Sequence, residues 1–352
     1  MGYQISCILR AKSPGRVMHF NETFNMKILD ESELCFPELS NISCRKPRLS
    51  HPEMVVTYIM SYVTPVIIVI LNLLVIISIS HFKQLHTPTN LLLLSLAFSD
   101  FFVGLMFILH VLMVNKCWML TEIVCAFFSI LDFTSSSASV GTMVLISVDR
   151  YVAICDPLYY STKITVRTVT VCICLCWFCS FVYNIVLMND NLNKLDRYIS
   201  CLGQCVIVID YIAGAADVIF TFIAPVTVII VLYMRVFVVA VSQARAMRSH
   251  ITSVRLSGTV SAKKSELKAA RTLGVVIVVF LICLCPYFIS SLLIQEELFN
   301  ATSLPLQNWF FYINSCLNPV IYAFCYSWYR KSIKLIVTLK IFESDSCEAS
   351  VL

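Results

Sequence analysis

The sequence predicts an all-α membrane protein, a bundle of seven transmembrane helices followed by a short amphipathic helix on the membrane surface. The first observation is composition, because 59% of the 352 residues are apolar and only 13% are charged, whereas about 25% is usual in soluble domains. The second is that apolar residues gather in seven long runs, each able to cross a hydrocarbon core of about 30 Å as a helix. The runs are residues 55–80, 90–114, 122–148, 167–188, 207–234, 272–295 and 305–327.

These runs divide the chain into three segments. Residues 1–54 are polar and are predicted to form an extracellular N-terminal tail. Residues 55–327 form the helical bundle, because backbone groups in hydrocarbon must pair within each segment and the alternation of membrane β-strands is absent. Residues 328–352 are predicted to form a helix against membrane lipid and a cytoplasmic tail, since bulky apolar residues are mixed there with Arg330, Lys331 and Lys334.

Basic residues indicate the orientation of the chain in the membrane. The connections after the first, third and fifth runs, with the C-terminal tail, carry most of the 26 Lys and Arg residues. The connections after the other runs carry only Lys116, Lys194 and Arg197. The positive-inside rule therefore predicts a multi-pass plasma-membrane protein with its N-terminus outside. The N-terminal tail is a weak exception, because its own basic residues are offset by acids.

Sequons and cysteines agree with this orientation. The asparagines of three glycosylation sequons fall on the predicted outer side: Asn21, Asn41 and Asn300. Four cysteines on that side face an oxidising compartment and are candidates for disulfide bonds: Cys44, Cys125, Cys201 and Cys205. Cys35 and Cys117 are also outside, so the sequence alone leaves the pairing open.

Carboxylates inside the apolar runs are costly and usually functional. The acids in or at the ends of the runs are Asp100, Asp132, Asp149, Asp210 and Asp217. Asp132 precedes Arg150, and Asp217 precedes Arg235, by five helical turns, about 27 Å in each case. Two acids are therefore expected at one depth, near the outer face. The alternative is that one of them faces lipid or pairs with a hydroxyl group.

A second polar group is expected near the middle of the bundle. It comprises Asp100, Ser139, Asn314 and Asn318. Their oxygens are the hard ligands that a small cation such as sodium prefers. A neutral hydrogen-bonded cluster between packed helices is the alternative, and the sequence does not decide between the two. No cofactor is expected apart from such an allosteric sodium ion.

Motifs on these runs resemble those of the rhodopsin-like family of G-protein-coupled receptors. They are Asn72, Leu96–Asp100, Asp149-Arg150-Tyr151, Trp177, Pro225 with Tyr233, and Asn318-Pro319-Val320-Ile321-Tyr322, in this order on successive runs. The resemblance implies a heterotrimeric G protein as partner and a resting Arg150 held by Asp149 and Glu266. The other activation residues that it implies are Val140, Pro225, Tyr233, Phe280, Asn318, Pro319 and Tyr322. Leu284 replaces the tryptophan usual in the family, which removes a bulky side chain below the ligand.

Within that family the chain resembles the trace amine-associated receptors. The matching segments are Asn314-Ser315-Cys316-Leu317-Asn318-Pro319, Tyr326-Ser327-Trp328-Tyr329 and Cys201-Leu202-Gly203-Gln204-Cys205, although the family usually has Phe where Tyr329 stands. By this resemblance Cys205 pairs with Cys125, and Cys201 pairs with Cys44.

The resemblance also implies a ligand site. Asp132 is expected to pair with a ligand ammonium, and Tyr312 to hydrogen-bond Asp132. Phe133, Tyr287 and Phe288 are expected to offer aromatic faces to the cation. Asp217 replaces the serines of catecholamine receptors, and a second acid is typical of members that detect diamines such as cadaverine or putrescine.

The expected function is therefore an olfactory receptor for diamines or polyamines, coupled to a stimulatory G protein. A monoamine receptor is one alternative, and an amine transporter is the alternative from a different class. A transporter needs a pathway from both sides, whereas Asp132 and Asp217 are predicted on the outer side only. The chain has no His-Glu-x-x-His helix or Gly-x-Gly-Asp run, so no enzyme activity is expected, and no nucleic-acid partner is expected.

Overall fold

The computed structural model describes residues 33–39, 43, 45–46, 59–114, 121–189, 211–250, 274–286, 288, 304–343, 346–348 and 350–351. Helices make up nearly all of this part of the chain. Its only strands are β1 (Glu33–Leu34) and β2 (Arg45–Lys46), which pair antiparallel with Glu33 opposite Lys46.

Five helical stretches are long and apolar enough to cross a membrane: Ser61–His81, Pro88–Leu109, Ile123–Cys155, Val166–Leu187 and Ile212–Ser242. The elements that form them are η2 (Ile59–Val63), α3 (Thr64–His81), α4 (Pro88–Val114), α5 (Glu122–Cys155), α7 (Val166–Leu187), α9 (Tyr211–Val218), η5 (Ile219–Ile223) and α10 (Ala224–His250). Two shorter apolar helices are Gly274–Pro286 and Phe310–Cys325, the second within α12 (Leu304–Cys325).

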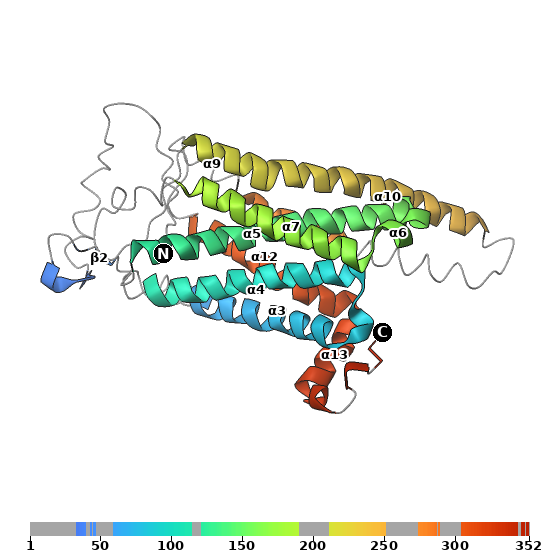
Figure 1. Cartoon of the computed structure of the whole chain (residues 1–352), viewed down its shortest axis with the longest axis horizontal. Coiled ribbons are helices and arrows are strands. Elements are labelled where there is room, and N and C mark those ends of the chain that lie inside the picture. Colours follow the sequence, from blue (N-terminus) through green and yellow to red (C-terminus); the bar gives the residue numbers. More distant parts are fainter. Residues whose placement is uncertain are drawn as a thin grey trace.

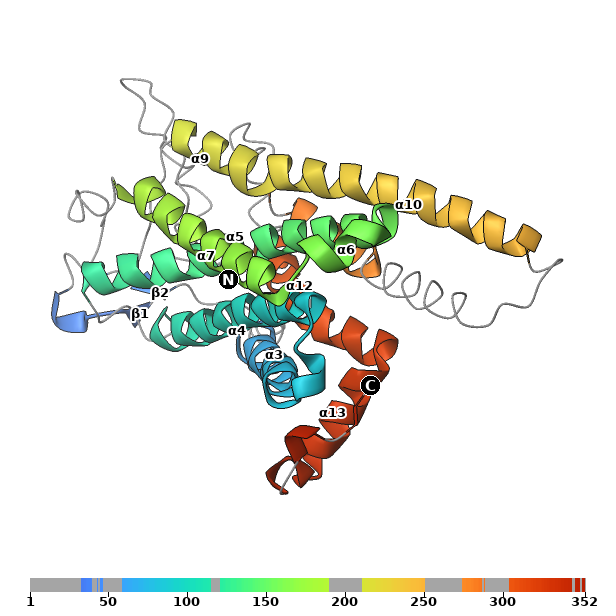
Figure 2. The same ribbon diagram turned by 45° about the vertical axis from the view of Figure 1, so that its right-hand side comes forward.

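The remaining helices are short. They are η1 (Pro37–Leu39), η3 (Lys83–Leu85), α6 (Pro157–Lys163), α13 (Ser327–Val337), η7 (Lys340–Phe342) and η8 (Ser346–Glu348). Trp328, Tyr329 and Ser332 of α13 are buried, whereas Arg330 and Lys331 are exposed, so this helix is amphipathic. Figure 2 shows α13 turning away from the end of α12.

The long helices run side by side along the long axis of the molecule (Figure 1). The helix α4 packs against α3 and α5, α5 packs against α7 and α10, and α12 packs against α3 and α4. Polar side chains join several of these helices: Trp177 Nε1 donates to Ser95 Oγ at 3.2 Å, and Ser95 Oγ lies 3.1 Å from Thr142 Oγ1. Such bonds connect helices that have no hydrophobic driving force between them in lipid.

The bundle exposes large apolar side chains on its outside and buries several polar side chains within its apolar core. Ile70, Phe178 and Phe220 are more than half exposed, whereas Asn72 and Asp100 are fully buried. A soluble protein has the opposite arrangement. Apolar side chains facing outward and hydrogen-bonding groups facing inward are what a helix bundle surrounded by lipid requires.

The C-terminal segment packs against the turn that follows α3. Lys83 Nζ forms an ion pair with Glu348 Oε1 at 3.2 Å, Gln84 Nε2 donates to the Glu348 carbonyl at 3.1 Å, and Val351 is fully buried. The hydrogen bond from Lys83 to Glu348 raises the pKa of Lys83 above its usual value, so this exposed lysine stays charged at physiological pH.

Candidate functional site

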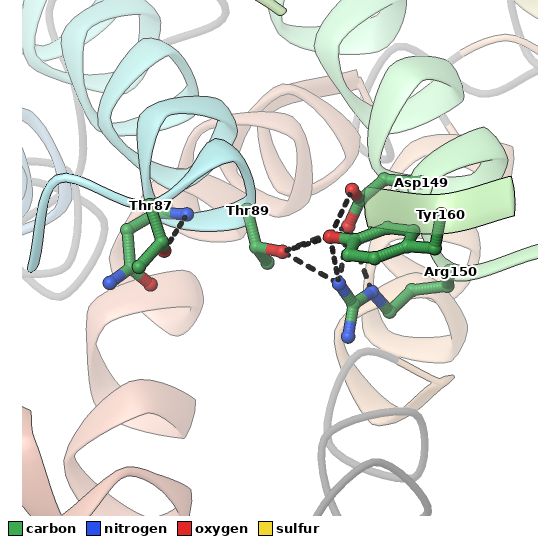
Figure 3. A network of polar contacts seen from close by, with 6 residues as sticks. Thr87, Thr89, Asp149, Arg150 and Tyr160 are labelled. Carbon is green, nitrogen blue, oxygen red and sulfur yellow. Dashed lines mark hydrogen bonds and ion pairs between the residues drawn. The ribbon is translucent and has the colours of Figure 1, made fainter. Parts of the chain in front are cut away.

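The first polar cluster lies near the C-terminal end of α5, where Figure 3 shows Asp149 and Arg150 together with Thr89 of α4 and Tyr160 of α6. Arg150 Nε donates to Asp149 Oδ2 at 2.9 Å, and Arg150 Nη2 donates to Thr89 Oγ1 at 2.6 Å. The side chains of Arg150 and Asp149 are 7% and 2% exposed. Removing one partner of such a buried ion pair typically costs about 3–5 kcal/mol.

Tyr160 completes this cluster. Its hydroxyl donates to Asp149 Oδ1 at 2.9 Å and lies 3.2 Å from Thr89 Oγ1, and Arg150 Nη2 lies 3.4 Å from the Tyr160 hydroxyl oxygen. Burial and the charge of Asp149 raise the pKa of Tyr160, so the phenol keeps its proton and remains a donor. Asp149 was expected to hold Arg150, whereas Thr89 and Tyr160 were not predicted. Glu266, the other expected partner, lies outside the described residues.

The other predicted activation residues gather below the middle of the bundle. Val140, Phe280, Leu284 and Tyr322 are buried members of one apolar core, with Tyr233 packed against it. The hydroxyls of Tyr233 and Tyr322 are buried and have no hydrogen-bond partner within the described part of the chain. Pro225 is half-buried at the start of α10. Two buried hydroxyls without partners are free to take one in another conformation or from a water molecule.

Asp100 is the centre of a second polar cluster. Ser315 Oγ donates to Asp100 Oδ1 at 2.9 Å, and Asn318 Nδ2 donates to Oδ2 at 2.8 Å. Ser139 Oγ is a more distant donor to Oδ1, at 3.5 Å. Three of the four predicted residues, Asp100, Ser139 and Asn318, are therefore joined by hydrogen bonds to Asp100. The fourth, Asn314, forms no such bond to Asp100, and Ser315, which was not predicted, takes its place.

The cluster suits a small cation as well as a neutral network. The side-chain oxygens of Asn314 and Asn318 are buried and accept no hydrogen bond from the described residues. Unpaired amide oxygens near a carboxylate are ligands that sodium accepts. No group of three or more His, Cys, Asp or Glu side chains that could hold a metal occurs in the described ranges.

Pro319 explains how this cluster is built. A proline inside a helix cannot donate to the carbonyl four residues earlier, which here belongs to Ser315. Asn72 Nδ2 of α3 donates to that carbonyl at 2.9 Å and so replaces the missing bond. The family motif residues Asn72 and Pro319 thus fix α12 against α3, with Asn318 facing Asp100.

The two predicted ligand acids differ in their hydrogen bonds. Asp132 lies on α5, and its Oδ1 is buried without a hydrogen-bond partner among the described residues. Asp217 lies on α9, and its Oδ1 accepts a hydrogen bond of 2.9 Å from the Tyr183 hydroxyl of α7. Leaving a buried acceptor unpaired typically costs about 1–3 kcal/mol, more for a charged group. Asp132 is therefore the acid that needs a donor.

Aromatic residues accompany these acids. Tyr312 stacks on Phe107 with ring centroids 4.2 Å apart and planes 2° from parallel. Asp132 Oδ1 accepts no hydrogen bond from the described residues, and the bond expected from Tyr312 to Asp132 stays a prediction. Phe288 stacks on Phe222 at 4.3 Å. Phe133 packs against the buried cluster of Cys125, Ile130 and Met188, whereas Tyr287 lies outside the described residues.

The predicted disulfide and glycosylation residues are only partly described. Cys125 is part of a disulfide bond, and Cys35 is also part of a disulfide bond. Cys35 was left without a role by the sequence, so the structure adds a bridge on the N-terminal segment. Cys44, Cys201, Cys205, Asn21, Asn41 and Asn300 lie outside the described residues, and the two proposed pairings therefore stay predictions.

Comparison with known proteins identifies the family. The family model named 7 transmembrane receptor (rhodopsin family) matches residues 71–322. The chain is 37% identical over 326 residues to trace amine-associated receptor 1 of Mus musculus, in an alignment that covers 89% of this chain and 98% of that protein. It is 35% identical over 336 residues to trace amine-associated receptor 13c of Danio rerio, covering 92% and 97%. It is 37% identical over 334 residues to trace amine-associated receptor 6 of Homo sapiens, covering 92% and 96%.

These relatives are receptors that need no cofactor and are not enzymes. The similarity extends over most of the chain, and the motif residues Asn72, Asp100, Arg150 and Pro319 hold the interhelical positions described above. The chain therefore belongs to the trace amine-associated receptors, within the rhodopsin family of seven-transmembrane receptors.

Proposed function

We propose that this receptor detects diamines at the cell surface and signals through a stimulatory G protein. The family senses amines and binds heterotrimeric G proteins, so the proposal concerns the ligand class and the G-protein type. The observation that carries it is a pair of acids, Asp132 and Asp217, on the outer parts of α5 and α9. An olfactory role rests on the family resemblance alone.

The proposed topology has seven spans, an extracellular N-terminus and α13 on the inner membrane surface. Five helices are long enough to span, and Gly274–Pro286 and Phe310–Cys325 are apolar segments of the remaining two. Basic residues in the proposed cytoplasmic parts support this orientation. The amphipathic α13, with Trp328 and Tyr329 buried and Arg330 exposed, suits the headgroup region.

Asp132 is the proposed anchor for the first ammonium. Its buried Oδ1 lacks a donor among the described residues, and an alkylammonium supplies three N–H donors together with the opposite charge. Phe133, Tyr287, Phe288 and Tyr312 are the proposed aromatic residues around the ligand, and their faces attract a cation. Leu284, in place of a bulkier residue, leaves space below for longer polyamines.

Asp217 is the proposed anchor for the second ammonium. Its Oδ2 is left for a ligand, since Oδ1 is the atom bonded to Tyr183. A diamine can place one ammonium on each acid, whereas a monoamine pairs with only one. The same Tyr183 bond favours the second candidate function, a monoamine receptor, because it gives Asp217 a partner without any ligand.

A dose–response experiment decides between these two functions. We expect cadaverine to activate cAMP production at lower concentration than pentylamine, its monoamine of equal chain length. Asp132→Ala should weaken both amines by well over tenfold at matched surface expression, because a buried ion pair is lost. Asp217→Ala should weaken cadaverine by about tenfold and spare pentylamine. Equal effects of Asp217→Ala on the two amines would favour the monoamine receptor.

In the resting state Arg150 is proposed to be held by Asp149 and Glu266, and activation is proposed to release it from both. Arg150 would then face the G protein, and Tyr233 and Tyr322 would supply their unpaired hydroxyls beneath it. The cluster at Asp100 is proposed to bind sodium in the resting state, with oxygens from Ser139, Asn314 and Asn318.

A further inference from the structure

The two ligand acids differ in one contact that the sequence did not suggest. The Tyr183 hydroxyl donates to Asp217 Oδ1 across the space between α7 and α9, at 2.9 Å. Both side chains are half-buried. Asp132 Oδ1, by contrast, accepts no hydrogen bond from any described residue. Asp132 therefore has a carboxylate oxygen that accepts no hydrogen bond from the described residues, whereas the Asp217 carboxylate is already oriented by the Tyr183 hydroxyl.

We propose that Tyr183 is a positioning residue that holds Asp217 toward the second ammonium of a diamine, and so sets the preference for diamines over monoamines. This inference rests on the proposed diamine function. It adds to that function a residue of α7 that is not itself one of the proposed ligand contacts.

Tyr183 and an ammonium group do not compete for Asp217. An ionised carboxylate has about four lone-pair sites on its two oxygens. The phenol occupies one of them on Oδ1, and Oδ2 remains for the charged donor. A carboxylate held in one rotamer before binding loses less conformational entropy when the ligand arrives. Tyr183 therefore strengthens the Asp217–ammonium pair rather than blocking it.

The helix that carries Tyr183 is fixed at the next residue. Asn184 Nδ2 donates to the Ser137 hydroxyl of α5 at 3.2 Å and to the Ser180 carbonyl at 2.8 Å. Asn184 is almost completely buried. This part of α7 is thus attached to α5, the helix that also carries Asp132. The backbone of Tyr183 is therefore held in place, and its hydroxyl can orient Asp217.

The chain around Asp217 has a matching irregularity. The π-helical turn η5 begins at Ile219, two residues after Asp217, and the Thr221 hydroxyl donates to the Asp217 carbonyl at 2.7 Å. A π-turn contains one extra residue and changes the direction of the side chains before it, and such turns are frequent at functional sites. The Asp217 side chain is therefore directed toward α7 both by the π-helical turn after α9 and by the hydrogen bond from Tyr183 of α7.

The test is the ratio of the cadaverine and pentylamine half-maximal concentrations, because a purely structural contact would change both. Tyr183→Phe removes only the hydroxyl, and we expect it to raise the cadaverine value about fivefold and the pentylamine value less than about twofold. In an Asp217→Ala background the same substitution should add nothing, since Tyr183 acts through that carboxylate. Surface expression is matched by flow cytometry.

Ser95→Ala is the matched control, because it removes the side-chain hydrogen bond from Trp177 of α7 to α4 while leaving both acids and the bond between Asn184 and Ser137 in place. We expect it to leave the ratio unchanged. An unchanged or reduced ratio in Tyr183→Phe, or an equal change for both amines, overturns the role of Tyr183. If Asp217→Ala itself leaves the ratio unchanged, the diamine function fails and the inference fails with it. If Asp217→Ala changes the ratio and Tyr183→Phe does not, only the inference fails.

Discussion

Tyr160→Phe is the perturbation that most directly tests how Arg150 is held. It deletes one oxygen from the cluster in Figure 3 and leaves the aromatic ring in place. The lost hydroxyl donates to Asp149 Oδ1 at 2.9 Å and lies 3.4 Å from Arg150 Nη2. In the proposed activation Arg150 leaves this cluster to reach a G protein, so these bonds would stabilise the resting conformation alone.

The size of the effect follows from the geometry. A hydrogen bond to a charged group contributes about 1.5–3 kcal/mol when it is buried. Tyr160 is only half-buried, so water replaces part of the lost bond, and we take about 1 kcal/mol. That free energy corresponds to about a fivefold change in the ratio of active to resting receptor. The basal signal should therefore rise about fivefold while the active fraction remains small.

Basal cAMP at matched surface expression measures this change. Tyr159→Phe is the control, because the neighbouring tyrosine is 64% exposed and has no place in the cluster. It removes the same atom and should leave the basal signal unchanged. A basal signal in Tyr160→Phe equal to that of the Tyr159→Phe control would show that the hydroxyl does not restrain Arg150, and the reasoning from Figure 3 would be wrong.

Three further substitutions test other parts of the molecule. Cys125→Ser should abolish surface display or the amine response, because Cys125 is disulfide-bonded; normal display and response would show that the bridge is dispensable. Asp100→Asn should remove any weakening of amine potency when sodium replaces choline in the buffer, whereas a sodium effect that persists would exclude this cluster. Glu266→Ala should raise basal cAMP severalfold if Glu266 restrains Arg150, and an unchanged basal level would leave Asp149, Thr89 and Tyr160 as the restraint.

Much of the fold could be predicted from the sequence, because a membrane-spanning helix is recognised by the length and hydropathy of one continuous segment. Hydropathy and length predicted the long helices that the structure contains, since lipid permits few alternatives to a helix. The helix ends were less predictable. The third run was predicted to end at residue 148, but α5 continues to Cys155. Asp149 and Arg150 pair with each other in the interior, so these charges do not end the helix.

The polar contacts were harder to predict because they depend on how helices pack. Tyr160 lies in a short connection and Tyr183 lies among apolar residues, so no sequence pattern singles them out, although each donates to a predicted acid. Ser315 was missed for another reason. It is adjacent to Asn314, and the two positions point about 100° apart on a helix. Which of them meets Asp100 depends on the packing of α12 around Pro319, and this requires three-dimensional information.

The helix α5 connects the clusters discussed above. It carries Asp132 near its outer end, Ser139 in the middle and Arg150 near its inner end, within one helix of 34 residues. Ser139 has the longest of the three bonds to Asp100, at 3.5 Å, so this bond adds little resistance to a small shift of α5. The proposed ligand binding at Asp132 would therefore act on the same helix that carries Arg150, about 27 Å away. We infer that a small movement of α5 as a unit, rather than a chain of local rearrangements, couples the two ends, and that substitutions at Ser139 should change the efficacy of an amine more than its affinity.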